Sequence, residues 1–208
     1  MSKSEEAKFV VFEGLDGSGK TTCLGRVAKW LSERGTPAII TREPGGTPLG
    51  EELRDVFLDQ RWGALDGTVE MLLMAACRRQ HLLQVVEPAL RSGMNVFCDR
   101  FSDSSVAYQG AGRGSNLAMI EDVNHWATMG RHPDLVIWFD LPAELALARS
   151  AKCTRIDHET LAFHQRVADG YESLFENEPE RWFRIATDAY DERETFARVA
   201  TRLRHLLV

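Results

Sequence analysis

A glycine-rich stretch near the N-terminus restricts the possible folds of this chain more than any other segment. Residues 14–21 read G-x-x-x-x-G-K-T, with an apolar run at 9–12 before them and a helix-compatible segment at 22–33 after them. A strand, a glycine loop and a helix in this order form a phosphate-binding loop, in which backbone N–H groups and the helix N-terminus surround an anion. The stretch therefore predicts a nucleoside triphosphate site.

The residue types inside the loop predict separate roles. Lys20 would reach the β- and γ-phosphates, and the hydroxyl of Thr21 would bind Mg²⁺. The residues predicted to contact the triphosphate are Gly14, Leu15, Asp16, Gly17, Ser18, Gly19, Lys20, Thr21 and Thr22.

Length and composition favour one domain over 1–208, because 208 residues with 44% hydrophobic content can form one sizeable core. The net charge of −6 argues against a general binder of nucleic acid or of membrane surfaces. Residues 1–8 lack the apolar run of a signal peptide, and no stretch is long and apolar enough to span a membrane. The four cysteines are far apart and form no C-x-x-C pair. We therefore expect a reduced, cytoplasmic setting.

Short apolar runs alternate with helical segments, which is typical of an α/β fold. The runs are continuously hydrophobic, as expected for parallel strands that are buried on both faces. The predicted strands are 9–12, 38–41, 95–98, 135–140 and 184–186. The predicted helices are 22–34, 49–59, 68–92 with a break at Pro88, 117–129, 143–149, 158–177 and 192–207.

Polar residues follow each predicted strand, and ligands of open parallel sheets bind at the carboxyl ends of the strands. The segment 41–47 is rich in turn-forming residues, and Asp99 and Arg100 follow the third strand directly. Asp99 would hold Mg²⁺ through water, while Arg100 would bind a phosphate. Further on, Tyr108 and Gln109 precede a glycine run that predicts a flexible loop beside a sugar site.

Four arginines lie on loops after strands or on the helices that follow, namely Arg42, Arg54, Arg78 and Arg100. Together they could form a pocket for an acceptor phosphate that faces Lys20. Phosphoryl transfer between two anionic molecules needs such a pocket, since its catalysis is chiefly positioning and charge neutralisation.

Three motifs in this order resemble bacterial thymidylate kinases: 13–22, 41–47 and 99–110, with Arg113-Gly114 and Pro133-Asp134-Leu135 in addition. The resemblance implies transfer of the ATP γ-phosphoryl group to dTMP, which gives dTDP for dTTP synthesis, with Mg²⁺ required. It also implies a three-layer P-loop kinase fold with a five-stranded parallel sheet flanked by helices, a short mobile lid at about 149–157, and a homodimer.

The resemblance also implies roles for individual residues. Asp16 would contact the 3′-hydroxyl of the acceptor sugar, and Arg100 would clamp the acceptor phosphate beside Asp99. Tyr108 would pack on the deoxyribose and disfavour a 2′-hydroxyl. The residues implied to bind dTMP are Asp16, Arg42, Arg54, Met74, Arg78, Arg100, Ser105, Tyr108 and Gln109.

The chain departs from the family pattern at two places. Met74 and Ala75 stand where relatives carry an aromatic residue that stacks on thymine, so we expect the apolar thioether of Met74 to pack on the base. Gly17 stands where some relatives carry a loop arginine, which predicts that the catalytic cation comes from the lid. The lid cations are Arg149, Lys152 and Arg155, and the predicted catalytic set is Lys20, Asp16, Arg100 and Arg155.

Two alternatives remain open at this point. The changed base site is compatible with a related kinase that prefers another deoxynucleotide. The altered lid, in which Thr154 and Asp157 replace an aspartate and a glutamate, is compatible with a nucleotide-binding protein of weakened catalysis. A GTPase is disfavoured because the chain lacks a convincing N-K-x-D motif.

Overall fold

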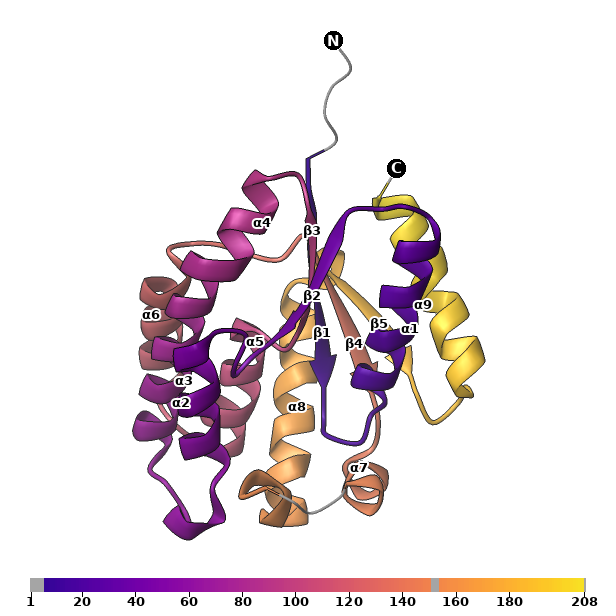
Figure 1. Ribbon diagram of the computed structural model, residues 1–208. Helices are drawn as coiled ribbons and strands as arrows, with labels where there is room; N and C mark the ends of the chain where they lie inside the picture. The colour runs from indigo at the N-terminus through magenta and orange to yellow at the C-terminus, as the bar shows by residue number, and fades with distance from the viewer. Residues whose placement is uncertain (1–5, 151–153, 208) are drawn as a thin grey trace.

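The computed structural model describes residues 6–150 and 154–207. Its centre is a five-stranded parallel sheet in the order β2-β3-β1-β4-β5, which confirms the predicted α/β class (Figure 1). The strands are β1 Phe9–Gly14, β2 Ala38–Arg42, β3 Asn95–Asp99, β4 Leu135–Asp140 and β5 Trp182–Ala186.

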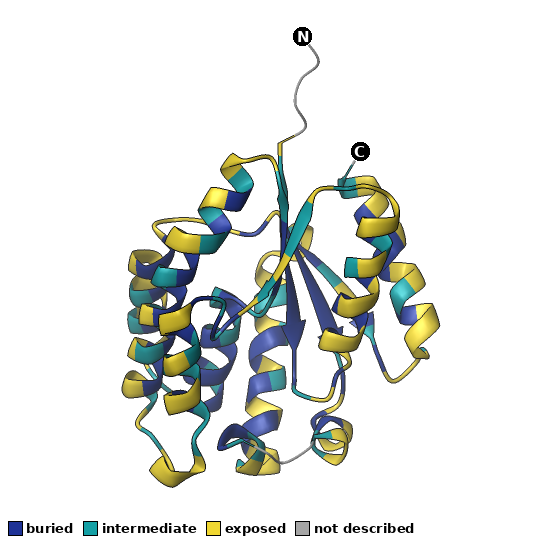
Figure 2. Cartoon of the chain, viewed as in Figure 1, coloured by how far each residue is buried: buried dark blue, intermediate teal, exposed yellow. Residues whose placement is uncertain are grey.

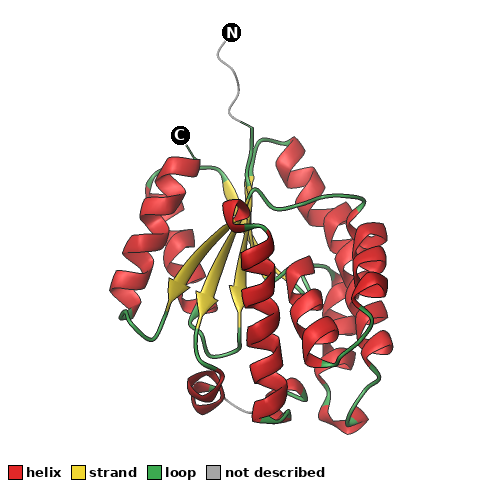
Figure 3. Cartoon of the chain, turned by 180° about the vertical axis from the view of Figure 1, so that it is seen from behind, coloured by secondary structure: helices red, strands yellow, loops and turns green. Residues whose placement is uncertain are grey.

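Helices cover both faces of the sheet and complete three layers. In Figure 3, which views the molecule from behind, the long helix α8 lies in front of the sheet. The helices are α1 Lys20–Glu33, α2 Pro48–Leu58, α3 Gly67–His81, α4 Glu87–Arg91, α5 Ser102–Ser105, α6 Leu117–Thr128, α7 Ala143–Arg149, α8 Leu161–Asn177 and α9 Glu192–Leu206. Among the described residues, no helix combines the length and apolar character needed to cross a membrane.

The strands are apolar throughout because alternate residues enter two different cores. Val10 and Phe12 of β1 pack in a cluster with residues of α1 and α9. Phe9 and Val11 point to the opposite face, where they pack with Val86 and the segment around it. All four side chains are buried, as are the central strands in Figure 2. Burial of each such side chain stabilises the fold by roughly 1.5–3 kcal/mol.

The break predicted at Pro88 is misplaced. The helix α3 ends at His81 and continues as a π-helical turn, Leu82–Val86, before α4 begins at Glu87. Pro88 lies in the first turn of α4, and the residues before it, Val86 and Glu87, keep right-handed helical backbone angles. The wider π turn before it is the irregular element, because the proline ring and its lost donor disturb the preceding turn.

The prediction of a flexible glycine loop after Tyr108 is wrong. Residues Val106–Gly112 form a buried π-helical segment that continues α5. A Cβ atom on Gly112 would lie 2.8 Å from Phe163 Cε2, and one on Gly170 would lie 2.8 Å from Ala111 Cβ. These glycines therefore allow α8 to approach closely, which is a packing role rather than a source of flexibility.

Candidate active site

One cavity of about 660 Å³ lies at the carboxyl ends of the parallel strands. It joins the loop after β1 to the segments after β2 and β3, to α2 and α3, and to the region around 149–157. Its lining includes thirteen of the residues predicted from the sequence: Asp16, Gly17, Lys20, Thr21, Arg42, Arg54, Met74, Arg78, Asp99, Arg100, Ser105, Tyr108 and Gln109.

The phosphate loop has a backbone that only glycine adopts readily. Gly14, Gly17 and Gly19 have φ values of 136°, 83° and 92°. A Cβ atom on Gly17 would also lie 2.7 Å from the carbonyl oxygen of Ala146 and 3.1 Å from Arg149 Cβ. The loop therefore packs directly against α7, so a side chain at position 17 would displace Arg149.

Lys20 begins α1 and is buried in the loop. Its Nζ donates hydrogen bonds to the carbonyl oxygens of Gly14 and Leu15 over 3.0 and 2.7 Å. Burial lowers the pKa of Lys20 to about 8, with the nearby charge of Arg100 adding to the effect and Asp16 opposing it. The ammonium group is thus held by neutral carbonyls at a position where a phosphate would stabilise its charge.

Thr21 and Asp99 meet at the opening of the loop. The Thr21 hydroxyl donates a 2.9 Å hydrogen bond to Asp99 Oδ2. A hydroxyl and a carboxylate are hard oxygen ligands of the kind that Mg²⁺ binds together with nucleotide phosphates. The two predicted metal residues therefore lie together with donor chemistry that fits Mg²⁺.

Arg100 connects the third strand end to the phosphate loop. Its Nη2 donates to Asp16 Oδ1 over 2.7 Å and to the Tyr108 hydroxyl over 3.1 Å. Burial alone would raise the pKa of Asp16, but the positive charges of Arg100 and Lys20 outweigh it and lower the pKa to about 2. Asp16 therefore stays ionised, and it positions charge rather than accepting a proton.

A second set of contacts, which the sequence did not reveal, holds the other side of Arg100. Its Nη1 donates to the hydroxyls of Ser104 and Tyr171 over 3.2 and 3.1 Å. Both hydroxyls also donate to the fully buried carboxylate of Glu13, over 2.6 and 2.8 Å. Burial raises the pKa of Glu13 to about 6, although Arg100 partly offsets it. Arg100 has a φ of 70°, and this network holds that uncommon backbone in place.

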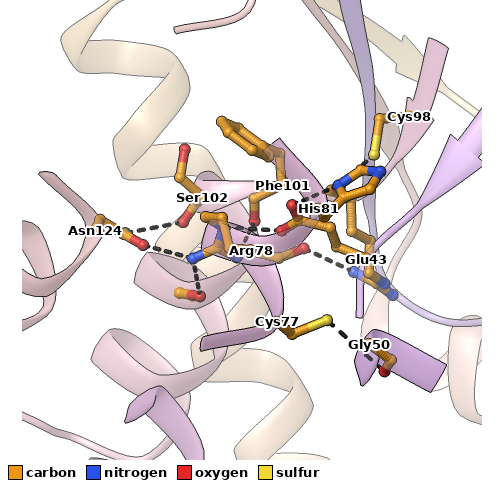
Figure 4. A network of polar contacts seen from close by, with 12 residues as sticks. Glu43, Gly50, Cys77, Arg78, His81, Cys98, Phe101, Ser102 and Asn124 are labelled. Atoms are coloured by element: carbon orange, nitrogen blue, oxygen red, sulfur yellow. Dashed lines mark hydrogen bonds and ion pairs between the residues drawn. The ribbon is translucent and has the colours of Figure 1, made fainter. Parts of the chain in front are cut away.

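Arg78 is buried in a network of polar contacts (Figure 4). Its Nε donates to Glu43 over 2.8 Å, and its Nη1 donates to Ser105 and Asn124 over 3.1 and 2.6 Å. Its Nη2 donates to the carbonyl oxygen of Phe101 over 3.0 Å. These contacts leave one guanidinium N–H of the five for the cavity that Arg78 lines.

Glu43 pairs with Arg78 and also contacts His81. His81 Nδ1 lies 2.9 Å from Glu43 Oε1, and its Nε2 lies 2.7 Å from the Thr41 hydroxyl. The turn-rich segment after β2 is therefore tied to α3 through buried polar contacts. His81 lies three residues after Arg78, a helical spacing that indicated the shared face.

Met74 and Tyr108 form the apolar part of the cavity wall. Both are buried and belong to one core cluster with Phe57, which also lines the cavity. Tyr108 lies under the guanidinium of Arg100, with the Arg100 Cζ 5.0 Å from its ring centroid. Met74 lies one helical turn before Arg78 on α3, so the thioether and the guanidinium share one face.

Arg42 and Arg54 line the cavity at its outer side. Arg42 Nη2 donates to Glu51 over 2.6 Å, and Arg54 Nη1 donates to the carbonyl oxygen of Pro44 over 2.9 Å. The side chain of Arg42 is 52% exposed, so an anion in the cavity could compete with Glu51 for it.

The structure places Arg155 away from the cavity, in contrast to its predicted catalytic position. Arg155 is buried, and its Nη1 and Nε donate to Glu70 and to the carbonyl oxygen of Phe57 over 2.6 and 3.1 Å. Arg155 therefore anchors its own stretch of the chain, residues 154–157, to α2 through Phe57 and to α3 through Glu70. Of the three lid cations, exposed Arg149 lines the cavity, and Lys152 lies outside the described residues.

Other predicted residues have supporting positions. Asp157 accepts hydrogen bonds from Ser150 and from both the backbone and the hydroxyl of Thr154, so it joins the two described sides of the lid. The remaining loop residues are absent from the described cavity lining: Gly14, Leu15, Ser18, Gly19 and Thr22. Residue 153 also lies outside the described part of the chain.

Comparisons with known proteins agree with this geometry. The family model of thymidylate kinase matches residues 12–196. A thymidylate kinase of Pelotomaculum thermopropionicum is 46% identical over 181 residues, covering 85% of this chain and 84% of the relative. One of Halalkalibacterium halodurans is 43% identical over 190 residues, covering 88% and 90%.

A solved structure supports the same assignment at the level of the fold. The crystal structure of thymidylate kinase from Ehrlichia chaffeensis superposes with a TM-score of 0.77 at 32% identity, and the match covers 95% of this chain and 98% of that one. Sequence and fold thus point to one family over almost the same residues. This chain belongs to the thymidylate kinase family.

Proposed function

We propose that this protein transfers the γ-phosphoryl group of ATP to dTMP and releases dTDP and ADP. The observation that carries this proposal is the joining of a phosphate loop and an arginine-lined pocket in one cavity, with the Arg100–Asp16 pair between them. Two phosphorylated molecules that bind in these halves would meet at their phosphates. Membership of the thymidylate kinase family names the acceptor.

The donor half consists of the phosphate loop. Lys20 and the loop N–H groups bind the ATP phosphates, and the hydrogen bonds of Lys20 to loop carbonyls are exchanged for phosphate contacts. Thr21 and Asp99 would hold Mg²⁺. When bound, Mg²⁺ neutralises phosphate charge and favours a reactive phosphate geometry.

The acceptor half positions the attacking phosphate. Arg100, supported by Arg42 and Arg54, binds the dTMP phosphate and directs one of its oxygens in line with the ATP γ-phosphorus. No general base is needed, because a phosphate oxygen is already an anionic nucleophile. Asp16, with its low pKa, holds Arg100 in place and lies near the sugar.

The sugar and base contacts follow from the cavity wall. The buried ring of Tyr108 lies where a deoxyribose would pack, and a 2′-hydroxyl would have to displace it. Met74 would pack on the base, while Ser105, Gln109 and the free N–H of Arg78 face its polar edge.

Arg149 is the lid cation that the arrangement favours as a transition-state ligand. A Cβ atom on Gly17 would lie 3.1 Å from Arg149 Cβ, so Arg149 lies beside the position of the missing loop arginine. Arg149 makes no hydrogen bond with any described residue, which leaves its guanidinium available to the transferred phosphoryl group. Arg155 then anchors the lid residues 154–157.

We also propose a cytoplasmic homodimer made of single-domain subunits. Large apolar side chains are exposed on α3, the π turn after it and α6, including Leu72, Leu83 and Trp126, the last 73% exposed. Exposed apolar patches of this kind mark protein–protein contacts. Cys23, Cys77 and Cys98 are buried free thiols, which supports a reduced compartment.

Release of ADP, measured with ATP, Mg²⁺ and one nucleoside monophosphate at a time, tests the activity and the alternatives. Preference for dTMP supports the proposal. Preference for another deoxynucleotide would support the related kinase, and ATP binding without ADP release on any acceptor would support the weakened nucleotide-binding protein.

A further inference from the structure

We propose that Glu70 is a positioning residue that fixes the orientation of the Gln109 amide and thereby sets which pyrimidine edge the acceptor pocket accepts. This inference rests on the proposed function and adds a determinant of its specificity. Glu70 lies on α3, one helical turn before Met74 and two turns before Arg78, and its side chain is fully buried.

The orientation of Gln109 follows from the hydrogen-bond chemistry of its partner. Gln109 Nε2 donates a 3.0 Å hydrogen bond to Glu70 Oε2. A carboxylate can only accept hydrogen bonds, so the amide must turn its NH₂ group towards Glu70. This assignment fixes the position of the carbonyl oxygen Oε1 as well.

Two guanidinium groups hold Glu70 in this position. Its Oε1 accepts hydrogen bonds from Arg113 Nη2 over 2.8 Å and from Arg155 Nη1 over 2.6 Å. Rotation of the carboxylate would leave the buried guanidinium of Arg155 without its carboxylate partner, which is costly. Glu70 therefore offers Oε2 to Gln109 as a fixed acceptor.

The carbonyl oxygen of Gln109 remains for the ligand. Gln109 lines the cavity, and its Oε1 accepts no hydrogen bond from the described residues. Arg78 provides one remaining N–H donor on the same wall. Besides the Ser105 hydroxyl, which can donate or accept, the wall thus presents one fixed donor and one fixed acceptor to the base.

The Arg78 donor and the Gln109 acceptor complement the hydrogen-bonding groups of one class of pyrimidine base. Thymine and uracil carry an acceptor at O4 and a donor at N3–H, which complement the Arg78 donor and the Gln109 acceptor. Cytosine carries the reverse pattern, with a donor at its 4-amino group and an acceptor at N3. A buried site with fixed hydrogen-bond groups rejects a ligand that leaves them unpaired.

The variant Glu70→Gln tests this polarity with almost no change in shape. Its amide oxygen must face Arg113 and Arg155, so its NH₂ group faces Gln109, which turns over and presents its own NH₂ to the cavity. We expect the affinities for dTMP and dUMP to fall on the order of 10- to 100-fold, while that for dCMP does not fall. Calorimetric titration of the three nucleotides measures the ratio, and a merely structural role would weaken all three together.

Two further variants make the result decisive. Gln109→Met removes the acceptor and should lower the ratio of the affinity for dTMP to that for dCMP, as Glu70→Gln does. The double variant should lower this ratio no further. Arg113→Gln changes the other side of Glu70 and the pair of Arg113 with Glu159, but leaves Glu70 Oε2 facing Gln109, so it should keep the wild-type ratio.

An unchanged ratio in Gln109→Met, or in folded Glu70→Gln, would overturn the proposal. If Glu70→Gln does not fold, Gln109→Met still tests whether Gln109 reads the base, and an unchanged ratio there overturns the proposal. Wild-type protein that binds dTMP without releasing ADP would contradict only the proposed catalysis, since the affinity ratio still tests Glu70.

Discussion

Arg100 and Asp16 form an ion pair of 2.7 Å that joins the end of β3 to the phosphate loop after β1. Both residues line the cavity, together with residues predicted to bind each of the two nucleotides. The side chain of Asp16 remains 46% exposed although that of its partner is only 14% exposed, so the pair faces the cavity on the carboxylate side. The contact therefore couples the geometry of the donor loop to that of the acceptor pocket.

Replacement of Arg100 should remove both phosphate binding and this coupling. We expect Arg100→Ala to lower kcat/KM for dTMP on the order of 10³-fold, because an arginine on a transferring phosphate stabilises developing charge. Initial-rate kinetics with Asp16→Asn and the double variant should show strong non-additivity, as expected for residues in contact. Additive losses would show that the pair does not act as a unit.

The pH dependence should reflect Lys20. Its pKa in the folded protein, about 8, governs the charge of the free enzyme. We expect kcat/KM for ATP to fall as the pH rises above about 8, whereas kcat should persist to higher pH because bound phosphates stabilise the ammonium group. A profile for kcat/KM that stays flat up to pH 10 would contradict the burial of Lys20 described above.

Lys20 should also destabilise the folded protein when no nucleotide is bound. Its folded pKa is below its unfolded value, so the unfolded state binds more protons between the two values and this group's contribution to stability increases as the pH rises through that window. Lys20→Met should therefore abolish turnover while leaving the thermal midpoint at pH 7 equal to or above that of the wild type. A lower midpoint in scanning calorimetry would assign Lys20 a structural role.

The packing of α8 on the π-helical segment predicts opposite effects for two glycines. Gly112→Ala places a methyl group 2.8 Å from Phe163 Cε2, so we expect a loss of roughly 1–3 kcal/mol in the free energy of unfolding. Gly25 lies exposed in α1 with no atom near its Cβ position, so Gly25→Ala should add about 0.5–1 kcal/mol. Denaturant titration compares them, and equal effects would rule out close packing as the cause.

Substitution of the two described lid arginines, Arg149 and Arg155, should have different effects on turnover and on stability. Arg149→Ala should lower kcat on the order of 100-fold with little change in unfolding, since Arg149 is exposed and lines the cavity. Arg155→Ala should instead destabilise the fold by roughly 3 kcal/mol, because it removes a buried partner of Glu70. Kinetics and unfolding measured on both variants would contradict this division if Arg155→Ala alone reduced kcat in a stable protein.

The parts of the molecule that depend on local pattern could be predicted from the sequence. The phosphate loop and the residues after β2 and β3 follow from strand ends and glycine spacing, and the structure brings Lys20, Asp99 and Arg100 to one edge. Parallel topology requires this convergence, so it could be inferred without coordinates.

Contacts between distant segments could not be predicted in this way. Tyr171 is 71 residues from Arg100 in the chain, and no local signal links them. The basic lid predicts Arg155 in the cavity, but the structure pairs Arg155 with the buried carboxylate of Glu70. Glu70 itself has a usable signal, since it lies at helical spacing before Met74 and Arg78 on the same face.

The most direct test of the central claim is the rate of ADP release by the wild-type protein with ATP and Mg²⁺, measured with dTMP and with each other common nucleoside monophosphate at the same concentration. The account predicts that dTMP gives the highest kcat/KM and that Lys20→Ala abolishes its turnover. A higher kcat/KM for any acceptor other than dTMP, or undiminished release by Lys20→Ala, would contradict it.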